Sequence, residues 1–197
     1  MQTTTLSFDN IHTHGTLFTN VLRARHQSFI VQRKWNLPQV DGMEFDQYDT
    51  PQSRWIAVHD GGQVLAGIRL TPTTARCGIY SYMIRDAQAG LLATIPDTLL
   101  FGQAPVSPKV WESSRVFIAH DVPSCLRSRV QRDLMTEMVN TAQLLGAERL
   151  LGLCPQVWGR WMRRIGPVGV RSCCITPSAV SAFTVAAAKL RLRWSNT

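Results

Sequence analysis

The sequence has no run of about 20 uninterrupted apolar residues, which is the length that spans a bilayer as a helix. Its first 14 residues also lack the basic start and the apolar stretch of a secretory signal. We therefore expect a soluble protein that stays in the cytoplasm and has no membrane partner.

Cysteine is scarce, with 5 among 197 residues, and no two of them have CxxC spacing. An odd number without that spacing argues against a disulfide framework and against a zinc site. The histidines likewise show no metal-ligand spacing. We expect reduced thiols and no bound metal.

Acidic residues are few, since 13 Asp and Glu stand against 21 Lys and Arg, a formal net charge of +8. Many of the arginines form two clusters, Arg127, Arg129 and Arg132 and then Arg160, Arg163 and Arg164. Two interpretations remain open: a solvated basic face, or a docking surface for an acidic partner. No nucleic-acid-binding motif accompanies the charge, so we expect no nucleic acid partner.

The length and the 45% share of hydrophobic residues suit a single domain over residues 1–197. Helical periodicity, with Thr16 as the first N-cap, covers residues 16–34, 84–92, 127–145 and 157–165. Runs typical of β-strands lie within 1–15 and over 54–59, 64–71, 110–118, 149–153, 168–175 and 182–186. Gly61 and Gly62 predict a hairpin, and the later alternation of strand and helix predicts an α/β fold.

The apolar face of the first helix contains an arginine, Arg25, in register with Leu17, Val21 and Phe29. A guanidinium keeps its charge, and an unpaired buried charge is strongly destabilising. Carboxylates should therefore converge on Arg25. The loop after the helix supplies them at Glu44, Asp46 and Asp49.

The strand at 110–118 contains a glutamate and an arginine, Glu112 and Arg115, three residues apart. In a regular strand they would point to opposite faces of the sheet. If both serve one site, a bulge near Ser113 and Ser114 is required. Such a bulge would also free backbone N–H groups that could stabilise an oxyanion.

The charged residues of the last two paragraphs and three further side chains closely resemble the signature of the acyl-homoserine lactone (autoinducer) synthases. The residues that carry the resemblance are Arg25, Phe29, Trp35, Glu44, Asp46, Asp49, Arg69, Glu112 and Arg115. The resemblance covers roughly the first 120 residues in order and spacing, and the last third of the chain shares only the pattern of elements. One departure is that residues 82–84 read Tyr-Met-Ile where the family usually has a phenylalanine.

The resemblance implies a fold class: α/β, a single domain with a mixed twisted sheet flanked by helices, similar to the Gcn5-related N-acetyltransferases. It also implies a reaction. The amine of S-adenosyl-L-methionine takes an acyl group from a thioester, and its carboxylate then closes to a lactone and expels methylthioadenosine. The product is a quorum-sensing signal.

The resemblance also implies roles for individual side chains. The catalytic residues would be Glu112, Arg115, Arg25 and Arg69, with Glu112 as the base that takes the proton of the amine, directly or through a water. The substrate-binding residues would be Phe29, Trp35, Asp46, Asp49 and Gly152. Taken alone, the aromatics are typical of a core, Arg69 of an exposed strand position, and the charged residues of an architectural ion-pair network.

Gly152 is the residue we associate with the acyl group. The resemblance implies that Gly152 lies at the inner wall of the acyl pocket, where a glycine leaves room for the acyl chain. Met83, Phe101, Trp158 or Trp161 could narrow that wall. The resulting pocket would favour a branched or aromatic acyl chain over a long straight one. The alternative is that the glycine serves only strand packing.

The expected partners are an acidic acyl carrier protein or a coenzyme A thioester, and S-adenosyl-L-methionine. We expect no cofactor and a monomer. Two other functions remain open: an acetyltransferase-like enzyme with another amine acceptor, and a non-catalytic basic module. Residues 127–132, RSRVQR, lack the glycines of the acetyltransferase pyrophosphate turn, which argues against an ordinary acetyl-coenzyme A enzyme.

Overall fold

The computed structural model describes residues 1–100, 102–155, 171–172 and 180–186. The chain divides into two compact units. Unit 1 consists of Met1–Leu70 and Arg115–Met138, and unit 2 of Thr71–Ser114 and Val139–Thr197. Each unit draws on both halves of the sequence, and the single domain stays a prediction.

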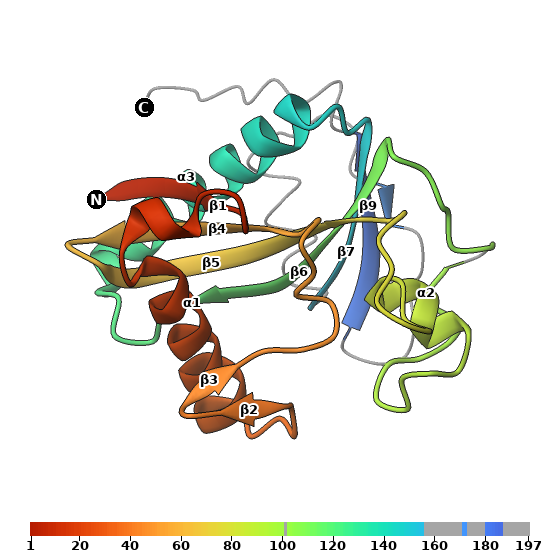
Figure 1. Ribbon diagram of the computed structural model, residues 1–197, viewed down its shortest axis with the longest axis horizontal. Helices are drawn as coiled ribbons and strands as arrows, with labels where there is room; N and C mark the ends of the chain where they lie inside the picture. The colour runs from red at the N-terminus through yellow and green to blue at the C-terminus, as the bar shows by residue number, and fades with distance from the viewer. Residues whose placement is uncertain (101, 156–170, 173–179, 187–197) are drawn as a thin grey trace. The chain divides into compact units, whose positions relative to one another are not determined.

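Unit 1 is built on antiparallel strands (Figure 1). β1 (Gln2–Leu6) pairs with β4 (Arg54–Asp60), and β4 pairs with β5 (Gln63–Pro72). Gly61 and Gly62 form the β4–β5 turn with φ of 53° and 87°, values that glycine adopts without strain. The predicted hairpin is confirmed.

Unit 2 contains the parallel pairing. β6 (Val110–Ile118) begins there and runs parallel to β7 (Arg149–Pro155), from Val110 beside Arg149 to Ser113 beside Gly152. β7 pairs antiparallel with β9 (Val180–Ala186), which also pairs with the short β8 (Arg171–Ser172). The strands thus follow the order β1-β4-β5-β6-β7-β9-β8, and the predicted mixed sheet is confirmed.

The first helix has two parts. After a 3₁₀ turn, η1 (Ile11–His14), the chain forms α1 (Leu17–Arg25) and continues as a π-helical segment, η2 (His26–Gln32). The predicted helix over 16–34 is confirmed in extent, but its periodicity gave no sign of the π-helical part. Thr16 is the N-cap residue, and its side chain makes no capping hydrogen bond.

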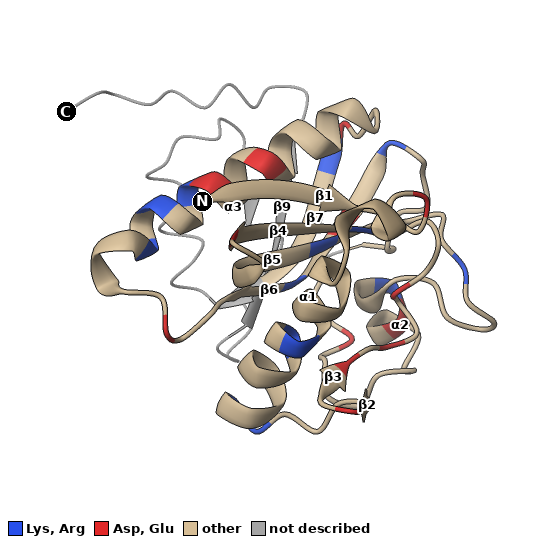
Figure 2. Ribbon diagram, turned by 60° about the vertical axis from the view of Figure 1, so that its left-hand side comes forward, with Lys and Arg blue, Asp and Glu red and all other residues tan. Residues whose placement is uncertain are grey.

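The loop after that helix is more regular than expected. β2 (Gln39–Val40) and β3 (Met43–Glu44) form a small hairpin, with Asp41 and Gly42 at positive φ in its turn. Two central residues at positive φ suit the twist of a two-residue hairpin. The hairpin places Glu44 beside α1, and Figure 2 shows the acidic positions of this loop next to that helix.

The remaining helices differ from expectation only at their ends. α2 (Met83–Gln88) is shorter than the predicted 84–92, because Gly90 turns the chain at φ 75°. α3 (Ser124–Leu144) starts just after Pro123. The predicted helix over 157–165, most of the strand over 168–175, and the side chains Phe101, Trp158 and Trp161 lie outside the described residues.

No helix of the described part of the chain is long and apolar enough to cross a membrane. Among the described residues no group of His, Cys, Asp and Glu could hold a metal ion. Cys77 and Cys125 are free and exposed.

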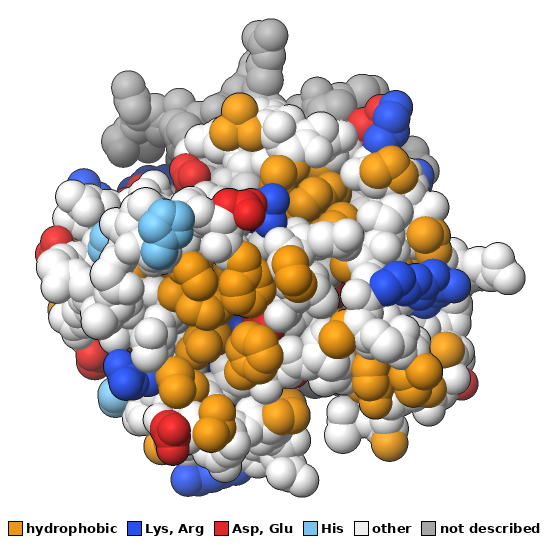
Figure 3. Space-filling view, viewed as in Figure 1, with side chains coloured by type: hydrophobic (Ala, Val, Ile, Leu, Met, Phe, Trp, Pro, Cys, Tyr) orange, Lys and Arg blue, Asp and Glu red, His pale blue; other side chains and the backbone are white. Residues whose placement is uncertain are grey.

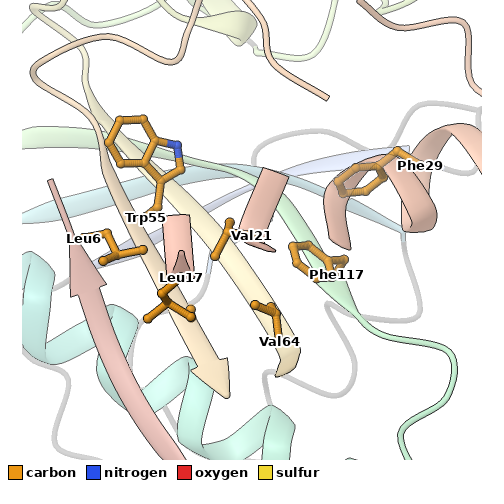
Figure 4. Close-up of a cluster of buried hydrophobic side chains, with 8 residues drawn as sticks. Leu6, Leu17, Val21, Phe29, Trp55, Val64 and Phe117 are labelled. Atoms are coloured by element: carbon orange, nitrogen blue, oxygen red, sulfur yellow. The ribbon is translucent and has the colours of Figure 1, made fainter. Parts of the chain in front are cut away.

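The hydrophobic core of unit 1 lies between α1 and the strands (Figure 4). Its buried members are Leu6, Leu17, Val21, Phe29, Trp55, Ala57, Val64 and Phe117. The alternate residues of β4, Ile56 and Val58, are fully buried as well, so both faces of that strand are covered. Figure 2 shows α1 and α3 on opposite sides of β1, β4 and β5.

Gly67 on β5 is required by its neighbour Phe117. A Cβ at residue 67 would lie 2.7 Å from Cε1 and 2.9 Å from Cζ of the Phe117 ring. The ring is 1% exposed and packs against Phe29, so it has little room to move.

We therefore predict that Gly67→Ala lowers the free energy of unfolding by about 1–3 kcal/mol, the usual effect of overpacking a core. Urea denaturation measures this change. Gly102→Ala is the matched control, because nothing lies within 4 Å of a Cβ built there. Equal stability of the Gly67 variant and the wild type would show that Phe117 yields freely.

Candidate functional site

Three arginines and three carboxylates of unit 1 form a buried ion-pair network. Its members are Arg25, Arg69, Arg115, Glu44, Asp46 and Asp49. Their formal charges cancel, and the side chains of all six are at most 7% exposed. A network buried this deeply is stable only if each charge has partners.

Asp49 is paired with both Arg25 and Arg69. Arg25 donates to both of its oxygens, from Nη1 at 2.7 Å and from Nη2 at 3.0 Å. Arg69 lies 3.0 Å away, and the Trp55 indole N–H donates at 2.8 Å. Burial alone would raise the pKa of Asp49, but Arg69 and Arg25 hold that pKa well below its usual range.

Glu44 and Asp46 join the arginines to one another. Arg25 Nε donates to Glu44 Oε2 at 2.6 Å, and Arg115 Nε donates to Glu44 Oε1 at 3.0 Å. Asp46 accepts from Arg69 Nη1 and, at 2.6 Å, from Arg115 Nη2. Burial disfavours the charged form of Arg69, yet Asp46 and Asp49 raise its pKa. The predicted convergence of carboxylates on Arg25 is confirmed.

Arg69 is the residue whose environment the strand pattern misjudged. The strand pattern without the family resemblance predicts an exposed arginine at this position. Its side chain is instead 0% exposed, because the 44–49 loop covers it and supplies two carboxylates. The resemblance, which grouped Arg69 with the site, gave the correct environment.

Arg115 reaches the network from an irregular point of β6. Its φ is +55°, in the left-handed region that costs a non-glycine residue free energy. The sequence predicts a bulge near Ser113 and Ser114, whereas the chain departs from regular strand geometry one residue later, at Arg115. The two ion pairs of Arg115 with Glu44 and Asp46 stabilise this strained backbone conformation.

An aromatic pair lies next to the network. The rings of Phe29 and Trp35 stack with centroids 5.3 Å apart and an interplanar angle of 14°. Phe29 is buried, while Trp35 is 47% exposed. Two guanidinium groups approach these rings: Arg33 at 5.0 Å from Phe29 and 5.4 Å from Trp35, and Arg115 at 5.8 Å from Phe29. The pair therefore accommodates cationic groups.

Sequence reasoning did not single out Arg33. Desolvation lowers its pKa from the ordinary value, and among the described residues no carboxylate forms an ion pair with it. Its position between two aromatic residues of the site was the signal that could have identified it. In Figure 3, hydrophobic side chains gather on the surface over α1 and the β2–β3 hairpin.

Glu112 belongs to unit 2 and has different partners. Its carboxylate is 1% exposed and accepts hydrogen bonds from Met83 N at 3.0 Å and Ile84 N at 2.8 Å. Burial and then the charge of Glu112 raise the pKa of Tyr82. These two bonds fix the carboxylate of Glu112 against the backbone at the start of α2.

Gly152 lies on β7 between two strands of unit 2. It is opposite Ser113 on β6 and Phe183 on β9. The residue is buried, which suits both the acyl-pocket role and the packing role.

The chain matches the family model described as autoinducer synthase over residues 9–194. It is 36% identical over 149 residues to an acyl-homoserine-lactone synthase of Ralstonia solanacearum, covering 72% of this chain and 67% of the relative. The crystal structure of TofI in a ternary complex with an inhibitor and MTA is similar at a TM-score of 0.73, with 26% identity and 95% and 92% coverage. An acyl-CoA N-acyltransferase from Pseudomonas aeruginosa, at 13% identity, 94% and 99% coverage and a TM-score of 0.60, shares the fold.

The network predicts a specific cost for neutralising its central acid. Asp49→Asn leaves Arg25 and Arg69 short of one negative charge, so we expect the free energy of unfolding to fall by about 3–5 kcal/mol near pH 7. Chemical denaturation measures it. Asp60→Asn is the control, because its side chain is 70% exposed and forms a surface ion pair with the amino terminus at 3.1 Å.

The same variant also gives a pH test. The folded pKa of Asp49 is depressed, so its contribution is present above the unfolded aspartate pKa of about 3.9 and is lost as pH falls through the folded value. The stability gap between wild type and Asp49→Asn should therefore narrow below about pH 4. A gap that is constant from pH 7 to pH 3 would mean that Asp49 is not held ionised by the arginines.

Proposed function

Because this chain belongs to the autoinducer synthase family, we propose that it makes an acyl-homoserine lactone with the residues described above. It is an acyltransferase that moves an acyl group from a thioester to the amine of S-adenosyl-L-methionine and then closes the lactone. The observation that carries this function is the buried ion-pair network beside a stacked aromatic pair that accommodates cations.

The reaction has two bond-forming steps. The amine nitrogen attacks the thioester carbonyl, the thiol leaves, and the amine proton goes to a base. A carboxylate oxygen then attacks the γ-carbon of the same substrate, and the bond to the sulfonium sulfur breaks with its electron pair on sulfur. Methylthioadenosine leaves as a neutral thioether, so no oxidant and no cofactor enters.

In this proposal Asp46 and Asp49 act by holding the arginines. Both oxygens of each carboxylate already accept hydrogen bonds from arginines, which leaves little capacity for a substrate amine. This supports the positioning role that the sequence left open beside direct substrate binding. Arg25 and Arg69 keep the 44–49 loop in place, and Arg115 presents its guanidinium near Phe29.

Phe29 and Trp35 would bind the sulfonium end of S-adenosyl-L-methionine. A cation over an aromatic face is favourable, and the structure has Arg33 in that position. A bound sulfonium would replace the Arg33 guanidinium on these rings.

Glu112 is the proposed base. The reference pKa of a free α-amine is about 7.7–8.0, so the substrate arrives largely protonated near neutral pH. A buried carboxylate at this place can accept that proton directly or through a water. The two backbone donors at Met83 and Ile84 hold it in one orientation.

The acyl donor would be carried by an acidic acyl carrier protein or by coenzyme A. Arg129 and Arg132 are exposed on α3, whereas Arg127 is tied to the carbonyl oxygen of His120 at 2.8 Å. Arg129 also lies 4.0 Å from Asp133, so the docking role is proposed from the exposure of Arg129 and Arg132 alone. The second cluster lies outside the described residues. We also propose that the protein acts in the cytoplasm, where its substrates are available, and that it is a monomer.

The function is tested by incubating the protein with S-adenosyl-L-methionine and a panel of acyl thioesters. Mass spectrometry should detect an acylated homoserine lactone and methylthioadenosine. An acylated amine without methylthioadenosine would instead indicate an acyltransferase with another acceptor. Absence of both products across carrier-protein and coenzyme A donors would contradict the proposal.

We predict that Glu112→Gln lowers the acylation rate by roughly 10²–10⁴, the usual range for losing an acid or base. The deficit should shrink as pH rises above about 8, because the amine then arrives deprotonated. Rates over pH 6–9 provide the measurement, with Glu148→Gln as the control, since Glu148 pairs with Lys109 at an exposed position. A deficit independent of pH would assign Glu112 a structural role only.

For Trp35→Ala we predict an increase of about 3- to 10-fold in KM for S-adenosyl-L-methionine, with little loss of stability because the ring is half exposed. Comparing a charged with an uncharged ligand identifies the cause of the change in KM. Inhibition by S-adenosylhomocysteine, which lacks the sulfonium charge, should change less than KM. Val40→Ala, another exposed apolar position of unit 1, serves as control. Equal changes for charged and uncharged ligands would exclude a cation–π role.

A further inference from the structure

Two buried polar atoms in residues 81–85 of unit 2 have no hydrogen-bond partner among the described residues. They are Ser81 Oγ and Arg85 Nη1. Ser81 is 1% exposed, so water does not replace the missing bond at its surface. Buried polar groups are nearly always hydrogen-bonded, and two exceptions within five residues need an explanation.

The rest of this segment is firmly held. The backbone N–H of Ser81 donates to Asp86 at 3.2 Å and 2.9 Å, and those of Met83 and Ile84 donate to Glu112. The Tyr82 hydroxyl donates to the carbonyl oxygen of Pro105 at 2.6 Å. These three backbone donors and the Tyr82 hydroxyl are therefore occupied, whereas Ser81 Oγ and Arg85 Nη1 have no partner among the described residues.

We propose that Ser81 Oγ and Arg85 Nη1 form a hydrogen-bonding subsite for a neutral oxygen acceptor of the acyl thioester. That oxygen is either the thioester carbonyl or an oxygen substituent further along the acyl chain. The inference rests on the proposed function and adds a recognition element that the family signature residues do not include.

The charge of the surroundings favours a neutral ligand group. The charged groups that act on Tyr82 are two carboxylates, Glu112 and Asp86, and two guanidinium groups, Arg85 and Arg76. Their formal charges cancel. A carboxylate or phosphate would add an uncompensated charge to a buried setting, whereas a carbonyl or hydroxyl oxygen can accept a hydrogen bond without adding one.

Such a subsite would discriminate strongly between donors. A site that contains buried hydrogen-bond donors rejects an analogue without the matching acceptor, because the donors are then buried and unpaired. Apolar walls discriminate far less between chains that differ by one methylene.

The test compares Ser81→Ala and Arg85→Met with wild type on two donors of equal chain length, one unsubstituted and one with an oxo or hydroxy group. We expect kcat/KM to fall about 5- to 10-fold for at least one donor, as for a lost hydrogen bond. A fall for both donors assigns the thioester carbonyl, and a fall for the substituted donor alone assigns the chain oxygen. Unchanged values for both donors in both variants overturn the proposal.

Thermal unfolding separates this subsite from a structural role. Ser81→Ala should unfold at the wild-type temperature or above, because no hydrogen bond within the protein is lost. Ser113→Ala is the matched control, since its buried hydroxyl donates to the Leu151 carbonyl at 3.1 Å and its loss should lower the temperature. A decrease in Ser81→Ala equal to that of the control overturns the proposal. If the wild type makes no lactone, the proposed function itself fails.

Discussion

The arginines of unit 1 cannot lose their charge, and this constraint organises the site. Arg25 and Arg69 are essentially inaccessible to solvent, so carboxylates must be folded over them. The 44–49 loop does this with three acids, Glu44, Asp46 and Asp49, which are two and three residues apart in the sequence. The β2–β3 hairpin, the strained backbone of Arg115 and the Trp55 indole all serve the same neutral cluster.

The ion-pair network holds the groups around the proposed substrate site in fixed positions. Buried ion pairs of this kind add little net stability compared with apolar packing, but they allow few alternative arrangements. The stacked Phe29–Trp35 pair adjoins this network through Arg115, which contacts Asp46 and approaches the Phe29 ring. Rigidity at this point suits an enzyme that must hold a cationic substrate in one orientation for two successive steps.

The sequence was sufficient for the pairing of Arg25 with carboxylates and for most of the strands, and physical reasons explain the rest. Arg25 on an apolar helix face required acids, and the glycines at 61 and 62 required a turn. Arg69 was misjudged because strand alternation carries no information about a loop that covers the strand. The π-helical part of residues 26–32 and the positive φ of Arg115 arise from tertiary contacts that no local pattern records.

The central claim is that the network acts as one coupled unit, and a double-mutant cycle tests it most directly. The free energies of unfolding of Arg25→Met, Glu44→Met and the double variant would be compared with wild type. Each single change strands a buried partner, so the account predicts that the double variant is less destabilised than the sum of the two by at least about 2 kcal/mol. Additive single effects would contradict the account.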